Sequence, residues 1–204
     1  MDAIGAKLSG SPVLHADETG VRCMGKTHWL HVVSNEELTL YSHSPRRGLE
    51  GIRVAGVLPE YSGQLMHDFW GAYDKLEHCE HLRCNAHLLR ELKACAEDKH
   101  RWATELSDIL VEMKQARDQA LRDDKDRVAG KRRRELEARY DEWITQGLAK
   151  HPVKPKSSGR RGRAKQSREH NLLKRMESKK AEILGFLHEI RLPLTTTSPS
   201  ETYG

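Results

Sequence analysis

The first half of the chain alternates apolar and polar residues in short runs, a pattern typical of β-strands. Residues 13–44 predict three strands, with glycines and a Ser-Asn pair at the turns. Residues 63–68 and 81–84 predict a fourth and a fifth strand. Residues 49–58 and 71–76 predict helices between the strands, and Pro59 follows the first helix. This order of elements predicts an α/β domain with a mixed sheet.

From residue 86 onward the apolar residues recur every three or four positions, which predicts amphipathic helices. Two stripes, ending at Met113 and Leu148, predict a helical hairpin with Gly130 at its turn. Pro193 stops a last predicted helix. The segment before that helix has no apolar period and reads as a flexible basic loop. The expected parts are a catalytic core at 1–97, a helical hairpin insertion at 98–150, a basic loop at 151–166, a closing helix at 167–192 and a tail at 193–204.

Composition points to a solvated, nucleic-acid-binding protein. Of the 204 residues 37% are hydrophobic and 32% are charged, which fits a compact part joined to a charge-rich helical part. The net charge of +5 is concentrated between Lys154 and Lys180, and such a segment favours a polyanionic partner. No run approaches the about eighteen apolar residues of a membrane span, and no signal peptide opens the chain. We therefore expect no membrane partner, a cytoplasmic location and free thiols.

Two aspartates are the strongest candidate site. Asp17 and Asp68 each end a β-prone run just before a break. Three antiparallel strands, a helix, then strand, helix and strand is the order of a ribonuclease H-like domain, in which the first and fourth strands are neighbours. Two adjacent carboxylates suit Mg²⁺ or Mn²⁺, which prefer oxygen ligands and retain water. Glu18 is a poor further ligand, because successive strand residues point to opposite faces. The alternative is that each aspartate only accepts local hydrogen bonds at a turn.

Several motifs resemble one family of mobile-element proteins. They are His-Ala-Asp-Glu-Thr-Gly at 15–20, Arg-Arg-Gly at 46–48, His-Asp at 67–68 with Tyr73, Cys-Asn-Ala-His-Leu-Leu-Arg-Glu-Leu at 84–92, and Arg-Gly-Arg at 161–163 with Asn-Leu-Leu at 171–173. In this order, over nearly the whole chain, they resemble the catalytic domain of insertion-sequence-66 family transposases. The resemblance implies a DDE transposase, in which two aspartates and a glutamate hold two Mg²⁺ ions to cleave and join DNA at the ends of an insertion sequence. It makes Asp17 and Asp68 the first two acids, and it leaves a homo-oligomer open.

The third acid is where the sequence departs from this family. Family members continue with Pro-Phe-Asp-Asn-Asn and then a glutamate and an arginine, whereas this chain reads Pro-Leu-Thr-Thr-Thr-Ser-Pro-Ser-Glu-Thr-Tyr-Gly from Pro193. Restoring one nucleotide near the Leu194 codon in a back-translation gives Phe-Asp-Asn-Asn-Gln-Pro-Glu-Arg-Asp-Ile-Arg. We therefore hypothesise a frameshift, which leaves Glu201 one place beyond the family position. The expectation is a fragment truncated at both ends, with little or no transposition of its own.

The remaining candidates concern DNA contact and cysteine chemistry. The basic loop offers phosphate contacts through Arg160, Arg161, Arg163 and Lys165, although a solvated surface is the alternative. Cys84 and His87 form a Cys-x-x-His pair that, by the resemblance, lies near the active site and shapes it. Zinc is the less favoured reading of the ligand-type residues Cys79, His81, Cys84 and His87. The alternative functions are a non-catalytic DNA-binding fragment and a zinc-stabilised nucleic-acid-binding protein.

Overall fold

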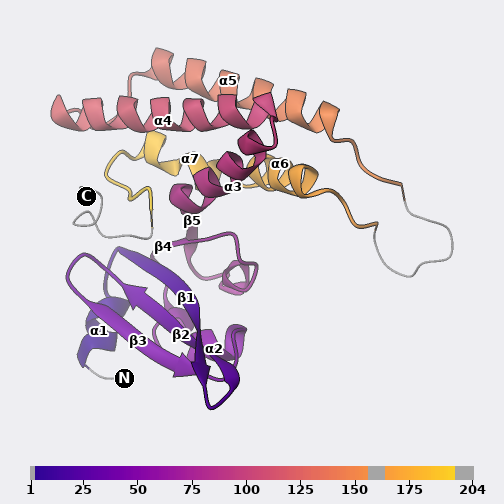
Figure 1. The fold of residues 1–204 in the computed structure, drawn as a ribbon. Coiled ribbons are helices and arrows are strands. Elements are labelled where there is room, and N and C mark those ends of the chain that lie inside the picture. Colours follow the sequence, from indigo (N-terminus) through magenta and orange to yellow (C-terminus); the bar gives the residue numbers. More distant parts are fainter. Residues whose placement is uncertain (1–2, 156–163, 196–204) are drawn as a thin grey trace. The chain divides into compact units, whose positions relative to one another are not determined.

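A computed structural model describes residues 3–155 and 164–195 of the chain (Figure 1). The chain divides into two compact units. One comprises residues 1–86 with 193–204 and contains the sheet, and the other comprises residues 87–192 and is helical. None of the helices in the described ranges is long and apolar enough to cross a bilayer.

The sheet unit contains the five strands that the alternating pattern predicts. They are β1 (Val13–Cys23), β2 (Lys26–Ser34), β3 (Thr39–Ser44), β4 (Gln64–His67) and β5 (Glu80–Arg83). Their order is β3-β2-β1-β4-β5. The first three strands are antiparallel, while β4 is parallel to both β1 and β5. The expected pairing of the first and fourth strands is therefore confirmed.

One face of β1 supplies the core of the sheet unit. Leu14 and Ala16 are fully buried, whereas His15 and Asp17, which alternate with them, are only half-buried. Leu8 and Ile52 pack in the same core cluster. They come from α1 (Ala3–Ser9) and α2 (Leu49–Val54), so these two helices cover the face of the sheet that carries Leu14. The alternation along β1 thus places Asp17 on the opposite face from the core.

The connecting helices differ from the sequence prediction. The helix expected over 49–58 ends at Val54, because Gly56 adopts a positive φ of 70° that no right-handed helix accommodates. A 3₁₀ turn, η1 (Leu58–Glu60), follows it. The helix expected over 71–76 is likewise reduced to a 3₁₀ turn, η2 (Tyr73–Lys75). Helix α1 was not predicted from the pattern.

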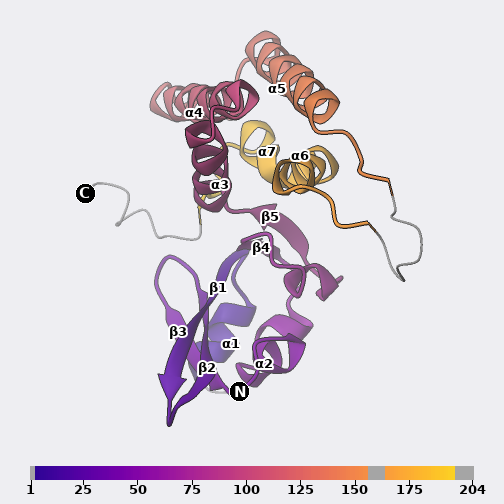
Figure 2. The same cartoon turned by 45° about the vertical axis from the view of Figure 1, so that its right-hand side comes forward.

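The helical unit buries the predicted apolar stripes. Its elements are α3 (Asn85–Glu97), α4 (Arg101–Arg122), α5 (Gly130–Lys150), α6 (Arg168–Ser178) and α7 (Lys180–His188). Helices α4 and α5 form the expected hairpin, with Leu106 and Leu136 fully buried. Helix α6 packs against α5 and α7 (Figure 2). Its Arg175 pairs with Glu91 of α3, and the Tyr140 hydroxyl of α5 donates to the Met176 carbonyl.

The single closing helix expected over 167–192 is wrong, because the chain forms two helices that meet at Lys179. Lys179 has φ −108° and ψ 19°, outside the helical region. The Tyr140 hydroxyl donates to the carbonyl of Met176 over 3.0 Å and so satisfies one of the last carbonyls of α6. Helix α6 can therefore end within the core without an unpaired carbonyl at that position.

Gly147 marks a close approach of α5 to α6. A Cβ atom at this position would lie 2.8 Å from Cδ2 of Leu173 and 2.9 Å from its Cδ1. We expect Gly147→Ala to lower the free energy of unfolding by about 1–2 kcal/mol, because overpacking outweighs the gain in helix propensity. Urea denaturation measures it.

Gly130→Ala is the matched control, since its Cβ would meet only the end of the Arg134 side chain at 3.4 Å. We expect this variant to be as stable as the wild type or slightly more so. A Gly147→Ala protein with the same gain as the control would contradict the observed α5–α6 packing.

Candidate metal and nucleic-acid site

The parallel pairing of β1 with β4 leads toward both aspartates: Asp17 lies within β1, opposite Val32 of β2, and Asp68 directly follows the last residue of β4. The ladder pairs Val13 with Gln64 and ends with His15 opposite Met66. The same register, continued by two residues, sets Asp17 level with Asp68. Neighbouring strands lie about 4.8 Å apart, and directly opposed residues point to the same face. The structure therefore places both predicted aspartates two residues beyond the last β1–β4 pair.

Each aspartate uses only one carboxylate oxygen in local hydrogen bonds. Oδ1 of Asp17 accepts from the Glu18 amide at 2.8 Å, and Oδ1 of Asp68 accepts from the Trp70 amide at 2.8 Å. The Oδ2 atoms have no hydrogen-bond donor among the residues that the structure describes. Within the same residues no group of three or more His, Cys, Asp or Glu side chains could hold a metal ion. Two carboxylates suit a hard divalent ion that takes its remaining ligands from water or phosphate oxygens.

Glu18, the residue after Asp17, is fully engaged on the opposite face of β1. Its side chain is 1% exposed. Oε2 accepts from the Tyr73 hydroxyl at 2.7 Å, and Oε1 accepts from Nη2 and Nε of Arg47 at 2.7 and 3.1 Å. Burial raises the pKa of Glu18, while the bonds from Tyr73 and Arg47 act in the opposite direction. Both oxygens are occupied, so Glu18 is not placed to bind a metal ion.

Tyr73 is buried behind the two aspartates. Burial raises the pKa of its hydroxyl far above the usual value, and the charges of Glu18, Asp68 and Asp17 raise it further. The phenol therefore remains protonated and donates to Glu18 at all ordinary pH values.

Arg47 lies between two indole rings. Its guanidinium carbon is 4.7 Å from the ring centroid of Trp29 and 4.4 Å from that of Trp70. Such cation–π contacts hold a guanidinium in one orientation. Trp29 comes from β2 and Trp70 follows Asp68 by two residues, so Arg47 joins two separate segments of the sheet unit.

A second buried network fixes the backbone at Asp68. Arg83, at the end of β5, has a side chain only 1% exposed and pairs with Asp74. It also donates to the Asp68 carbonyl at 3.1 Å. The His67 ring is bonded to the same carbonyl through Nδ1 at 2.7 Å and to Nδ1 of His81 through Nε2 at 2.8 Å. Since the carbonyl can only accept, His67 carries its proton on Nδ1.

Three histidines of the sheet unit, His15, His31 and His67, have lowered pKa values. Burial, with the nearby charge of Arg83 and the neighbouring His81, lowers the pKa of His67 to about 3. Burial is also the main cause for His15 and His31. His31 faces the carbonyl of Arg46 at 3.4 Å, and His67 lies on the core side of β4. These rings are therefore neutral at pH 7.

The cysteine candidates lie in packed surroundings. Cys84 is fully buried after β5, and its amide donates to the His67 carbonyl at 2.8 Å. His87 lies in the first turns of α3. Burial raises the pKa of the Cys79 thiol to about 11, so it is not a ready thiolate ligand. The alternative zinc ligands Cys79, His81, Cys84 and His87 do not gather into a metal-binding cluster in the described residues.

Of the predicted phosphate-contacting residues, Lys165 is described and is exposed, whereas Arg160, Arg161 and Arg163 lie outside the described residues. The two ends of the basic loop are bound to each other. Gln166 accepts from the Lys154 amide at 2.7 Å and donates to its carbonyl at 3.1 Å. His170 bonds to the His151 carbonyl at 2.7 Å. The loop therefore begins and ends at one place on the helical unit.

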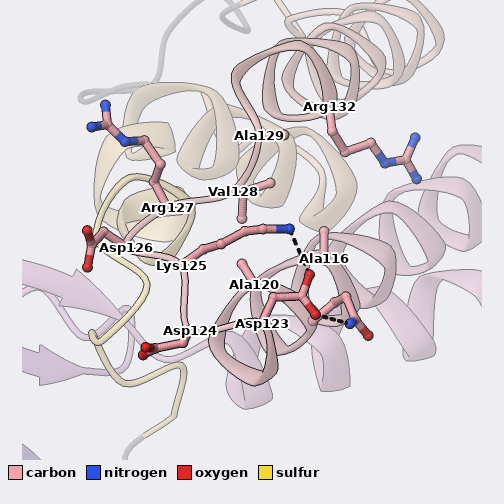
Figure 3. A pocket seen from close by; sticks show the side chains of 11 residues that line it. Ala116, Ala120, Asp123, Asp124, Lys125, Asp126, Arg127, Val128, Ala129 and Arg132 are labelled. Atoms are coloured by element: carbon pink, nitrogen blue, oxygen red, sulfur yellow. Dashed lines mark hydrogen bonds and ion pairs between the residues drawn. The ribbon is translucent and has the colours of Figure 1, made fainter.

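A surface pocket of about 630 Å³ lies at the turn between α4 and α5 (Figure 3). Its charged lining residues include Asp123, which accepts from Lys125 at 2.7 Å. None of the candidate residues lines it. The lining of this pocket therefore includes neither Asp17 nor Asp68.

The fold and the aspartates define a class, the α/β proteins that carry two acidic residues on a mixed sheet. Asp68 directly follows β4, whereas Asp17 lies within β1, which continues to Cys23, so the expected break after Asp17 is wrong. A family model described as Transposase IS66 family matches residues 1–198. The chain therefore belongs to the IS66 transposase family, which supports a role in transposition. No curated protein and no solved structure matches the chain.

Sequence reasoning found the aspartates but missed the residues that hold them. Arg47 and Tyr73 entered only as parts of family motifs, and Arg83 was not singled out. A hydrophobic pattern cannot predict that a charged residue is buried. Such a residue is assigned to the solvent-exposed surface unless its buried partners are known. The one available signal was a set of aromatic residues, Phe69, Trp70 and Tyr73, close behind Asp68.

The lowered pKa of His67 predicts a stability that depends on pH. In the unfolded chain His67 binds a proton with a pKa of about 6.5, whereas in the folded protein its pKa is about 3. The free energy of unfolding therefore falls as the pH drops below 6.5. We expect His67 to account for about 1.5 kcal/mol of the loss between pH 6.5 and 5. Urea denaturation at both pH values measures this loss in the wild type.

His67→Asn is the comparison, since its amide can still donate to the Asp68 carbonyl but does not titrate. Its stability should change less over the same interval. Equal losses in the two proteins would show that His67 does not contribute.

Proposed function

We propose that this chain carries the catalytic core of a DDE-class transposase on a ribonuclease H-like fold. Asp17 and Asp68 would hold Mg²⁺ or Mn²⁺. When bound, these ions activate water or a 3′-hydroxyl and stabilise the leaving oxygen during DNA strand cleavage and transfer. The observation that carries the proposal is the parallel pairing of β1 with β4, whose last pair, His15 with Met66, lies two residues before each aspartate. The strand order β3-β2-β1-β4-β5 supports the ribonuclease H-like assignment.

The segment after α7 runs next to the aspartates. The Leu194 carbonyl accepts from the Asn85 amide at 2.8 Å, and the backbone of Thr195 bonds to the ring of His15, two residues from Asp17. In the resemblance this is the segment that leads to the third acid. Residues 193–204 depart from the family pattern there, and Glu201 lies outside the described residues. We therefore propose that the chain binds metal and DNA but cleaves DNA weakly or not at all.

The DNA of the insertion-sequence ends is the proposed partner. Lys165, with Arg160, Arg161 and Arg163, would contact phosphates, and such contacts position DNA without reading its sequence. The bonds of Gln166 to Lys154 support this role, because they present the basic segment as one closed loop. A non-catalytic DNA-binding fragment is the second candidate, and the departure of residues 193–204 favours it.

Metal binding tests the aspartates. Asp17→Asn and Asp68→Asn should each weaken Mn²⁺ binding at least about ten-fold, because a neutral amide replaces one of two carboxylates. Titration followed by the electron paramagnetic resonance of free Mn²⁺ measures the affinity. Asp126→Asn, an exposed aspartate at the α4–α5 turn, serves as control and should bind as the wild type does. Equal affinity in all four proteins would refute the metal site.

Salt dependence tests the basic loop. Replacing Arg160, Arg161, Arg163 and Lys165 by glutamine should lower the slope of log affinity against log salt by about 0.9 for each phosphate contact that is lost. Fluorescence anisotropy with labelled duplex DNA measures the slope. Lys114, Lys125, Lys131 and Arg122 replaced by glutamine form a control of equal charge on α4, α5 and their connection. The same loss of slope in both variants would show a general charge effect and not a loop contact.

A further inference from the structure

We propose that Glu18 is a positioning residue, whose bonds to Tyr73 and Arg47 set the spacing between Asp17 and Asp68. This inference rests on the proposed metal site. It assigns a task to a buried carboxylate that the metal site does not use as a ligand.

No backbone pairing between β1 and β4 reaches the two aspartates. The β1–β4 ladder ends at the pair His15–Met66, two residues before each aspartate. The strands are free to separate beyond that pair, since no further ladder bond joins them in the described residues. The distance between the two carboxylates must then be set by contacts that cross from β1 to the segment after β4.

The Tyr73 hydroxyl makes the first such contact. Glu18 is the neighbour of Asp17 in β1, and Tyr73 lies in η2, five residues after Asp68. Their bond of 2.7 Å joins sequence positions 55 residues apart. It ties the turn that follows Asp68 to the strand that carries Asp17.

Arg47 makes the second contact. It donates twice to Glu18, and its guanidinium stacks on the ring of Trp70 with the centroid 4.4 Å away. The amide of Trp70 in turn donates to Oδ1 of Asp68 at 2.8 Å. A continuous path of contacts therefore leads from Glu18 through Arg47 and Trp70 to the carboxylate of Asp68.

The burial of Glu18 makes this network rigid. A carboxylate that is 1% exposed must keep its hydrogen-bond donors, because an unpaired buried charge is very costly. The hydrogen bonds from Tyr73 and Arg47 to Glu18 therefore fix the positions of all three side chains. Rigid carboxylate spacing raises metal affinity, because less ordering is left for the binding step.

Three variants test the inference by Mn²⁺ titration. Tyr73→Phe removes one hydroxyl and should weaken Mn²⁺ binding about five- to ten-fold. Glu18→Ala removes both contacts and should weaken it further. Glu18→Gln should fall between Glu18→Ala and the wild type, because its amide oxygen can still accept from one of the two partners, Tyr73 or Arg47.

Tyr61→Phe is the matched control. Tyr61 is buried in the same unit, and its hydroxyl bonds to the carbonyls of Ser11, Pro12 and Gln64. This variant should lose stability in urea as Tyr73→Phe does, yet bind Mn²⁺ as the wild type does. The control thereby separates positioning from general stability.

The outcomes distinguish the inference from the function on which it rests. Wild-type affinity in Tyr73→Phe, with binding lost in Asp17→Asn, would overturn the positioning role and leave the metal site intact. No Mn²⁺ binding by the wild type would overturn both. If the Glu18→Ala protein fails to fold, Tyr73→Phe and Glu18→Gln decide the test. A loss of Mn²⁺ affinity in Tyr61→Phe equal to that in these two variants would also overturn the inference.

Discussion

The parallel pairing of β1 with β4 is the constraint on which the sheet unit depends. It joins residues 13–15 to residues 64–66, about fifty positions later in the chain, and so closes the sheet around Leu14 and Leu65. Antiparallel hairpins could form β1 to β3 locally, but this pair needs the connection through α2 and η1. The burial of Leu14 and Leu65 fixes the register, because a slip by one residue would place the two side chains on opposite faces of the sheet. The same register determines which residues face each other at Asp17.

Buried charges surround the aspartates on the core side. Glu18 and Arg83 each have side chains 1% exposed, and each has charged or hydrogen-bonding partners. Buried ion pairs contribute little net stability, since desolvation offsets much of their attraction. Their effect here is on geometry. Arg83 donates to the carbonyl of Asp68, and Glu18 bonds to Tyr73 and Arg47. The two networks meet where the His67 ring lies against the Tyr73 ring, and both contact the turn after Asp68.

The helical unit has a core of its own, and it holds two segments of the chain in place through hydrogen bonds. Helices α4 to α7 bury the apolar stripes against one another, and Arg117 donates to the carbonyls of Ile190 and Leu192 after α7. These bonds fix the start of the segment that leads to Leu194. At the other end of the unit the hydrogen bonds of Gln166 close the basic loop. The unit therefore organises two segments that matter for the proposed chemistry, although it supplies neither aspartate.

The sequence by itself determined the five strands, the amphipathic stripes and the two aspartates. Each of these features follows from a local period or from a short motif. A local period and a short motif can both be recognised without knowing which residues are in contact in the folded protein. The tertiary structure alone decided the break of the closing helix at Lys179 and the partners of Glu18. These depend on contacts between distant segments, such as Tyr140 with Met176 and Tyr73 with Glu18. No pattern of hydrophobic and polar residues records such contacts, because a buried charged side chain and a solvated one look the same in a sequence.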